Sequence, residues 1–320
     1  MGPSSGSRRV RSAIGIDIGG TKVAALRVAE DGDVLDRRER PTPADDVAAT
    51  VETVSDLAAE LAAAGGEAIG VGAAGMVDFA AGVLRYAPNL AWREIPLRDL
   101  LSERTGLPCV VDNDANVAAW GEYRFGAARG YRHVLAVTVG TGIGGGIVAD
   151  GELLRGAHGF AAEIGHIIVE PDGPPCGCGN KGCWEQVASG RALGRLARAE
   201  VEREPAGRIA ALAGGAQASG RHVSEAAREG DPAAAAIFAT VGRRLGEGIA
   251  GLVNILDPEV VIVGGGVAEE GAVLLEPARE AFLDAVEAPE HRPEVPILAA
   301  TLGNDAGAIG AAALGLGLRL

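Results

Sequence analysis

The chain has 320 residues, 48% of them hydrophobic and 22% charged, with a formal net charge of −14 at pH 7. That balance is typical of a soluble globular protein, and the length suits two domains of ordinary size. Nucleic acid and anionic membrane surfaces repel so acidic a chain, and neither is expected as a partner.

The start of the chain and its apolar runs bear on its location. Residues 1–12 are rich in Gly, Ser and Arg and lack the apolar stretch of a secretory signal, which predicts a disordered tail. No apolar run in the sequence is long enough to cross a bilayer. We therefore expect a cytoplasmic location.

One pattern of strands and turns occurs twice. Residues 14–40 predict a strand, a Gly-Gly turn, a second strand, a hairpin turn at Asp31-Gly32 and a third strand, and residues 134–155 repeat the pattern around Asp150-Gly151. Each repeat is predicted to be an antiparallel meander that opens with a glycine loop. The repeat therefore predicts two related α/β domains with facing glycine loops.

The remaining elements indicate a mixed-sheet α/β class. Short apolar strands are predicted at 69–72, 109–112 and 260–263. Helices rich in Ala and Leu are predicted near 45–64, 116–126, 190–202, 233–255, 272–286 and 305–317. The segment near 203–232 shows no pattern that indicates a site.

The first glycine loop predicts a phosphate site. Asp17 ends a strand just before Gly19, Gly20, Thr21 and Lys22. Glycines let backbone amides face an anion, and the hydroxyl and the cation add to that attraction. Asp17 is expected to hold Mg²⁺ through water, because Mg²⁺ takes few carboxylates and keeps several waters.

Two further glycine clusters fit a nucleotide. Gly140-Thr141-Gly142 belongs to a GxGxxG run that ends at Gly145, but a strand follows it, which excludes a Rossmann site and leaves a phosphate-binding hairpin. Gly264, Gly265 and Gly266 follow an apolar strand and precede a helix, where an adenosine can lie against bare backbone.

Polar residues end another strand. In Asp112-Asn113-Asp114, one side chain is expected to cap the helix that begins at Ala115. A second can take the proton of an attacking hydroxyl while the neighbouring amide orients a sugar ring. Asp114 is the favoured base.

Residues 163–185 predict a metal site. Three thiols and one imidazole within this short segment form a closed tetrahedral Zn²⁺ site of structural type, with the ligands His166, Cys176, Cys178 and Cys183. Glu163 and Glu185 flank the loop and are expected to bind the hydroxyls of a polyol. The remaining cysteine, Cys109, is predicted to be a core residue.

On six motifs the chain resembles the ROK family (repressor, open reading frame, kinase) of sugar kinases, and within it the bacterial glucokinases. The motifs are IGIDIGGTK, VDNDANVAAWGE, TVGTGIGGGI, EIGH, CGCGNKGCWEQVASG and VVIVGGG, spread over roughly residues 14 to 317. The resemblance implies the actin-like (ribonuclease H-like) ATPase fold, two α/β domains with a cleft between them. Expected bounds are 13–112 plus 303–320 for the smaller domain and 113–302 for the larger one.

The resemblance also implies an activity and its residues. It implies ATP-dependent phosphorylation of the glucose 6-hydroxyl with Mg²⁺, Asp114 as the base, and a structural zinc beside the sugar pocket. Its sugar-binding positions fall on Asn89, Asn113, Asp114, Glu163, His166 and Glu185. A homo-oligomer, dimer or tetramer, is expected.

Three alternative functions are compatible with parts of this pattern. A kinase of N-acetylmannosamine, N-acetylglucosamine or fructose would use the same machinery. A non-catalytic sugar-responsive regulator is a second alternative, which the intact Asp114 and the complete phosphate loops disfavour. Polyphosphate in place of ATP is a third, disfavoured because relatives that use it generally lack the cysteine cluster.

Overall fold

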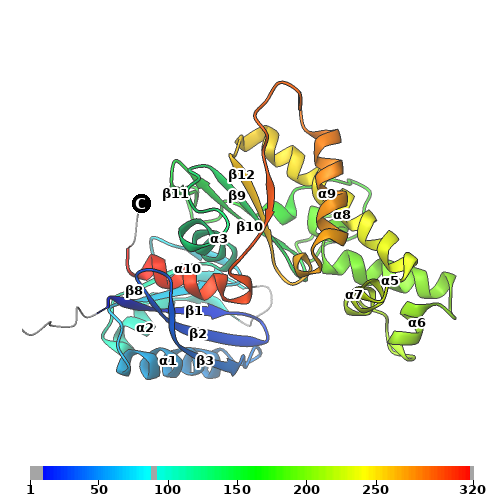
Figure 1. Cartoon of the computed structure of the whole chain (residues 1–320). Helices are drawn as coiled ribbons and strands as arrows, with labels where there is room; N and C mark the ends of the chain where they lie inside the picture. Colours follow the sequence, from blue (N-terminus) through cyan, green and yellow to red (C-terminus); the bar gives the residue numbers. More distant parts are fainter. Residues whose placement is uncertain (1–9, 88–91, 318–320) are drawn as a thin grey trace, which may run out of the picture. The chain divides into compact units, whose positions relative to one another are not determined.

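The computed structural model describes residues 10–87 and 92–317, which divide into two compact units (Figure 1). Unit 1 contains the chain up to Arg129, the segment Leu153–Ala161 and the chain from Asp305 onward. Unit 2 contains Gly130–Glu152 and Ala162–Asn304. Within the described ranges, no helix has both the length and the apolar character of a membrane span.

A five-stranded mixed sheet forms the centre of unit 1, in the order β3-β2-β1-β4-β8. The first three strands pair antiparallel as the predicted meander, and the other two run parallel to β1. The bounds are β1 (Ser12–Ile18), β2 (Lys22–Ala29), β3 (Val34–Pro41), β4 (Ile69–Ala73) and β8 (Cys109–Asn113). A smaller antiparallel sheet contains β5 (Met76–Asp78), β6 (Val83–Tyr86) and β7 (Arg93–Ile95).

The side chains of β1 alternate between the two faces of this sheet. Ile14, Ile16 and Ile18 are fully buried in a core shared with α1 (Val47–Ala63), while Gly15 and Asp17 face α10 (Ala306–Gly315). A Cβ on Gly15 would lie 1.7 Å from the carbonyl oxygen of Ala308, so only glycine lets α10 pack this closely. Figure 1 shows α1 and α10 on opposite sides of the sheet.

Two further helices complete unit 1: α2 (Leu97–Thr105) and α3 (Asp114–Phe125). The helices α3 and α10 interlock through glycines, because a Cβ on Gly310 would lie 1.7 Å from the carbonyl oxygen of Val117. This packing keeps α3 in unit 1, whereas the domain bound expected from the resemblance lies before it, at 112/113.

Unit 2 repeats the strand order of unit 1, as β11-β10-β9-β12-β13. β9 and β10 pair antiparallel, β12 runs parallel to β9, and β13 runs parallel to β12. The bounds are β9 (Val134–Val139), β10 (Ile143–Ala149), β11 (Glu152–Leu153), β12 (Val260–Gly264) and β13 (Ile297–Ala299). Asp150 and Gly151 have φ of 52° and 80°, the conformation of the predicted hairpin turn.

The helices of unit 2 are α4 (Trp184–Ala188), α5 (Gly190–Arg203), α6 (Arg208–Ala213), α7 (Gly220–Arg228), α8 (Pro232–Leu256) and α9 (Ala272–Ala285). The sequence did not indicate three of them, α4, α6 and α7. The segment near 203–232 forms α6 and α7. Three 3₁₀ turns, η1 (Ile164–His166), η2 (Ala268–Glu270) and η3 (Gly303–Asp305), complete the described elements.

Candidate functional site

The carboxyl ends of β1, β4 and β8 bring Asp17 and Asp114 together in unit 1. In the sheet register, Asp17 pairs with Gly72, and Gly72 pairs with Asp112 on its other side. A Cβ on Gly72 would lie 2.4 Å from Cγ2 of Val117 and 3.5 Å from Cα of Asp114. The missing side chain therefore lets the start of α3 approach the strand ends.

The electrostatics of these two carboxyls are unusual. Burial raises the pKa of Asp114, and hydrogen bonds from the amides of Ala115 and Asp114 and from the Asn113 side chain oppose that rise. Burial and the Asp114 charge raise the pKa of Asp17 to about 7, and Lys22 acts in the opposite direction. Paired carboxyls with raised pKa values are typical of sites that hold a cation or transfer a proton.

Asn113, and not Asp114, caps α3. Its Oδ1 accepts hydrogen bonds from the amides of Ala115 at 2.8 Å and Asn116 at 3.1 Å, and its Nδ2 donates to the carbonyl oxygen of Gly75 at 3.1 Å. The helix begins one residue earlier than expected, at Asp114. The capping role that could have explained Asp114 is therefore taken by its neighbour.

Asp112 has a structural partner. Its side chain is 2% exposed, and Nε of Arg155 donates to Oδ2 at 2.7 Å. Nδ2 of Asn116 and the Asn113 amide donate to Oδ1 at 3.0 and 2.8 Å. The Arg155 guanidinium also lies 3.9 Å from the ring centroid of Phe79. This buried ion pair joins the segment Leu153–Ala161 to the strand end that carries Asp114.

The first glycine loop is a tight turn closed by a hydrogen bond from the Gly19 amide to the Lys22 carbonyl oxygen at 3.0 Å. Gly20 and Thr21 are exposed at its tip. Nζ of Lys22 donates to Oε1 of Glu39 at 3.0 Å in an exposed ion pair. The loop has the expected shape, while its cation is engaged with β3.

The second glycine loop is joined to the N-terminus of α5. The amides of Gly190 and Arg191 donate to the carbonyl oxygens of Gly140 at 2.9 Å and Thr141 at 3.1 Å, and Oγ of Ser189 donates to Thr141 at 2.9 Å. A strand, β10, follows this loop, which confirms that it is no Rossmann turn.

The three glycines of the third cluster have different surroundings. Gly265 has φ of 89°, and a Cβ there would lie 2.7 Å from the carbonyl oxygen of Val139, so the turn requires this glycine. A Cβ on Gly264 would lie 2.9 Å from that of Ala300, whereas one on Gly266 would meet nothing within 4 Å. Gly266 therefore offers open backbone.

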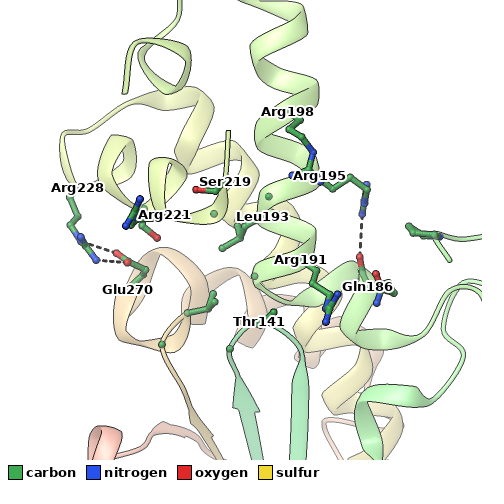
Figure 2. A pocket seen from close by; sticks show the side chains of 18 of the residues that line it. Thr141, Gln186, Arg191, Leu193, Arg195, Arg198, Ser219, Arg221, Arg228 and Glu270 are labelled. Carbon is green, nitrogen blue, oxygen red and sulfur yellow. Dashed lines mark hydrogen bonds and ion pairs between the residues drawn. The ribbon is translucent and has the colours of Figure 1, made fainter. Parts of the chain in front are cut away.

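A cavity of about 1110 Å³ in unit 2 is lined by residues of the second and third glycine clusters (Figure 2). Gly140 and Thr141 line one part of it, Gly266 and Val267 another, and Pro174, Pro175 and Gln186 come from the cysteine loop and the start of α4. Its size is that of a site for a cofactor-sized ligand. The sequence did not indicate the residues that α5 and α7 contribute: Arg191, Arg195, Arg198, Gly220, Arg221, Ser224 and Arg228.

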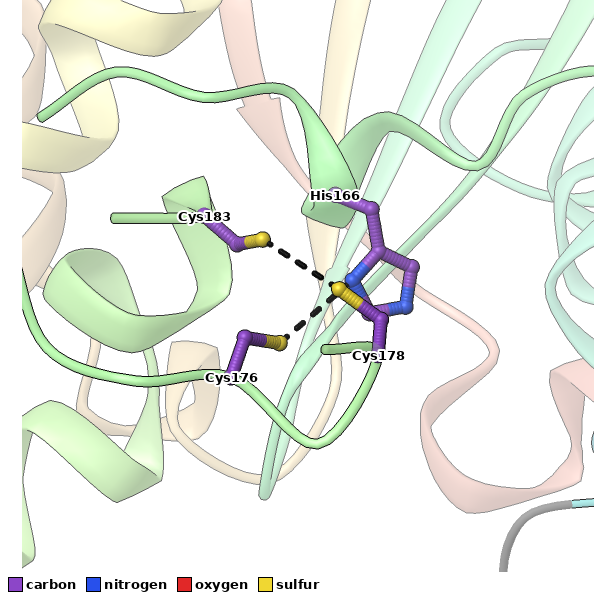
Figure 3. A group of neighbouring side chains, drawn as sticks. All are labelled: His166, Cys176, Cys178 and Cys183. Atoms are coloured by element: carbon purple, nitrogen blue, oxygen red, sulfur yellow. Dashed lines mark hydrogen bonds between the residues drawn. The ribbon is translucent and has the colours of Figure 1, made fainter. Parts of the chain in front are cut away.

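The four predicted zinc ligands converge (Figure 3). Their ligand atoms all lie within 4.8 Å of one another. Sγ of Cys178 and Sγ of Cys183 are 3.6 Å apart, and Sγ of Cys176 and Nδ1 of His166 are 3.7 Å apart. Zn–S bonds of about 2.3 Å in a tetrahedron place the ligand atoms about 3.7 Å apart. The donor set and its spacing therefore fit a closed Zn²⁺ site.

The thiols of this cluster titrate unequally. Burial, with Cys178 and Cys176 adding to it, raises the pKa of Cys183 to about 12. Burial also raises the pKa of Cys176, while the backbone amide of Asn180 lowers that of Cys178. Neighbouring thiolates disfavour one another without a cation, so the cluster is suited to a metal.

Glu185 lies between the cysteine cluster and the second glycine loop. Its Oε1 accepts from Sγ of Cys176 at 3.1 Å and from Nε2 of Gln186 at 2.9 Å. A Cβ on Gly142 would lie 2.2 Å from Oε2 of Glu185. The carboxylate expected to bind sugar thus contacts the loop expected to bind phosphate.

The segment before η1 is strained at Ala162, whose φ is 68°. Glu163 follows it and is exposed, and the His166 amide donates to the Glu163 carbonyl oxygen at 3.1 Å. Cys109 is buried, as predicted. Asn89 lies outside the described residues.

The repeated sheets, each opening with a glycine loop, define an actin-like ATPase fold, and the ROK family model matches residues 13–317. The chain belongs to the ROK family.

The glucokinase of Streptomyces coelicolor is 47% identical over 310 residues, spanning 94% of this chain and 96% of that protein. The glucokinase of Thermotoga maritima is 40% identical over 313 residues, with the same shares of 94% and 96%. A crystal structure of a ROK family glucokinase from Streptomyces griseus in complex with glucose and AMPPNP has a TM-score of 0.86 and 47% identity, covering 96% of this chain and 100% of that one.

Proposed function

We propose that this chain is an ATP-dependent glucokinase, which transfers the γ-phosphoryl group of ATP to the 6-hydroxyl of glucose. The observation that carries the proposal is the Asp114 carboxyl, which lies half-buried at the strand ends with a raised pKa and is not the cap of its helix. A carboxylate with this environment is suited to accept a hydroxyl proton during the transfer.

Unit 2 supports the nucleotide part of the proposal. The cavity lined by Gly140, Thr141 and Gly266 has the size of a nucleotide site and open backbone at two places. The phosphates lie at Gly140–Gly142, and the adenosine lies at Gly266. Backbone amides stabilise charge that develops on the phosphates.

Carboxylates around the cysteine loop support the sugar part. Glu185 is held by a hydrogen bond from Nε2 of Gln186, and Glu163 is placed by the turn before His166. Carboxylates and the His166 imidazole bind the sugar hydroxyls, and the Asn113 side chain, whose Nδ2 donates to the Gly75 carbonyl oxygen, is a further sugar ligand in this proposal. Asn89 is a further sugar ligand in this proposal.

Two metal ions belong to the proposal. Zn²⁺ would be held by His166, Cys176, Cys178 and Cys183, where it would fix the loop that carries Glu185. Mg²⁺ would be held beside Asp17, whose pKa of about 7 reflects a buried charge that a cation would stabilise. Its chemistry there is the neutralisation of phosphate charge.

The substrate assignment is tested by initial rates with a panel of sugars and donors. Glucose with ATP should have a higher kcat/KM than N-acetylmannosamine, N-acetylglucosamine or fructose, and ATP should exceed polyphosphate. A higher value for an N-acetylated sugar would overturn the glucose assignment and leave the kinase assignment standing.

The mass of the assembly in solution tests the expected homo-oligomer.

A further inference from the structure

The cavity of unit 2 carries an unusual charge. In a chain with a net charge of −14, its lining includes five arginines and one carboxylate, Glu270. Arg228 is paired with Glu270, whose side chain is 7% exposed. The other four arginines, Arg191, Arg195, Arg198 and Arg221, have no ionic partner among the described residues. Such a surplus of cations around one cavity indicates an anionic ligand.

The four unpaired arginines differ in how they are held. Arg195 donates to the Gln186 carbonyl oxygen and Arg198 to that of Ala218, each at 3.4 Å. No side-chain hydrogen bond joins Arg191 or Arg221 to any residue in the described ranges. These two guanidinium groups therefore keep all their donors for a ligand.

Hydrogen bonds to the loop Gly140–Gly142 set the position of the Arg191 backbone. Its amide donates to the Thr141 carbonyl oxygen at 3.1 Å, and its cap Ser189 donates to the same oxygen at 2.9 Å. These bonds turn the loop carbonyls toward α5, while the amides of Thr141 and Gly142 donate to no described residue. Figure 2 shows the Arg191 side chain on the same side of the cavity as Thr141 and Gln186.

We propose that Arg191 is a phosphate-binding residue of the nucleotide site, which holds the terminal phosphates of ATP together with the loop Gly140–Gly142. This deepens the proposed function and rests on it. A guanidinium presents its donors in a planar fork that matches phosphate oxygens, and its charge is permanent. Arg191 discriminates nucleotides by their phosphates and has no contact with the adenosine.

The test is the binding of a ligand series to the wild type and to Arg191→Gln. The affinities for ATP and ADP should fall about 10- to 100-fold, the usual range for a charge-assisted hydrogen bond, while the affinity for adenosine stays within twofold. Arg191→Lys should recover part of the loss, since it keeps the charge without the fork.

Arg203→Gln is the matched control, because Arg203 lies on the same helix, outside the cavity, and pairs with Glu200. It should leave all affinities unchanged. An equal loss for adenosine and ATP in Arg191→Gln would show that the residue only maintains α5, and unchanged ATP binding would also overturn the proposal. If the wild type bound no ATP or failed to phosphorylate glucose with it, the proposed function itself would be wrong.

Discussion

The carboxyl of Asp17 is costly to ionise in the folded chain. Burial and the nearby Asp114 raise its pKa from 3.8 to about 7. The folded state therefore binds a proton more tightly than the unfolded state, and the free energy of unfolding falls as the pH rises from about 4 to 7. The ionised Asp17 carboxyl thus lowers the stability of the folded state at neutral pH.

Asp17→Asn should stabilise the chain at high pH and not at low pH. We expect a gain on the order of 4 kcal/mol at pH 8 in the presence of a chelator. At pH 4 the gain should be only a small fraction of this, because the carboxyl is protonated in the folded state and already about half protonated in the unfolded state. Urea unfolding at the two pH values measures it. Asp36→Asn is the control, since a backbone hydrogen bond from Arg37 lowers the pKa of Asp36. A gain for Asp17→Asn that is equal at both pH values would contradict the account.

At single residues, chemistry was easier to predict than geometry. Three thiols and a histidine in one short segment predicted a cluster that the structure brings together, because local spacing is enough to form it. The start of α3 was predicted one residue too late, and the sequence left open which of three residues caps it, since Asn and Asp cap equally well. Arg155 gave no sequence signal, because its partner Asp112 lies 43 positions away.

The pair of Arg155 and Asp112 stabilises the attachment of Leu153–Ala161 to β8. Arg155→Met should destabilise the chain by about 3–5 kcal/mol, because it leaves a carboxylate that is 2% exposed without its cation. The free energy of unfolding in urea is the measurement. Arg155→Met combined with Asp112→Asn should recover much of the loss.

Arg104→Met is the matched control for that experiment. Nη2 of Arg104 lies 2.7 Å from Oδ1 of Asp56, the same length as the buried pair, but both side chains are largely exposed. Its loss should cost no more than about 1 kcal/mol. Equal costs for the two arginine variants would show that burial of Asp112 does not set the energy.

The cysteine loop is an element that a metal should hold in place. Trp184, next to Cys183, is fully buried, and its Nε1 donates to the Arg244 carbonyl oxygen at 2.8 Å. This bond anchors the start of α4 against α8. Cys178, by contrast, is exposed. We therefore expect a bound metal to be what holds Cys178, at the exposed end of this loop, in place.

Cys178→Ser should lose the metal and weaken glucose binding together. Metal analysis should find about one Zn²⁺ per wild-type chain and far less in the variant, because one closed site has four ligands. Cys109→Ala, in the core of unit 1, should keep the metal. Full metal content in Cys178→Ser, or full glucose affinity in a metal-free chain, would contradict this role.

At the scale of elements, hydrophobic periodicity and turn residues predicted both meanders and six helices. Asp-Gly turns and long Ala/Leu runs are local signals, which a sequence displays directly. The segment near 203–232 was missed. It forms α6 and α7, which are short and carry mixed charges, and residues of α7 complete the cavity. That role depends on packing against α5, which no local pattern displays.

At the scale of the whole molecule, the repeated meander predicted the repeated topology. Both central sheets have the order third, second and first strand of the meander followed by two parallel strands. The chain bounds of the units are less regular than the sequence suggested. Leu153–Ala161 belongs to unit 1 although its neighbours in the chain belong to unit 2, because Arg155 binds Asp112.

The central claim is that Asp114 is the base of a sugar kinase, and steady-state kinetics of Asp114→Asn test it most directly. The change keeps the size of the side chain and removes the proton acceptor. Because Asn113 caps α3, the melting temperature should not fall. We predict that kcat falls by ~10²–10⁴, the usual contribution of a general base, while glucose binding weakens far less. A kcat close to that of the wild type, in a folded variant that binds glucose, would contradict the account.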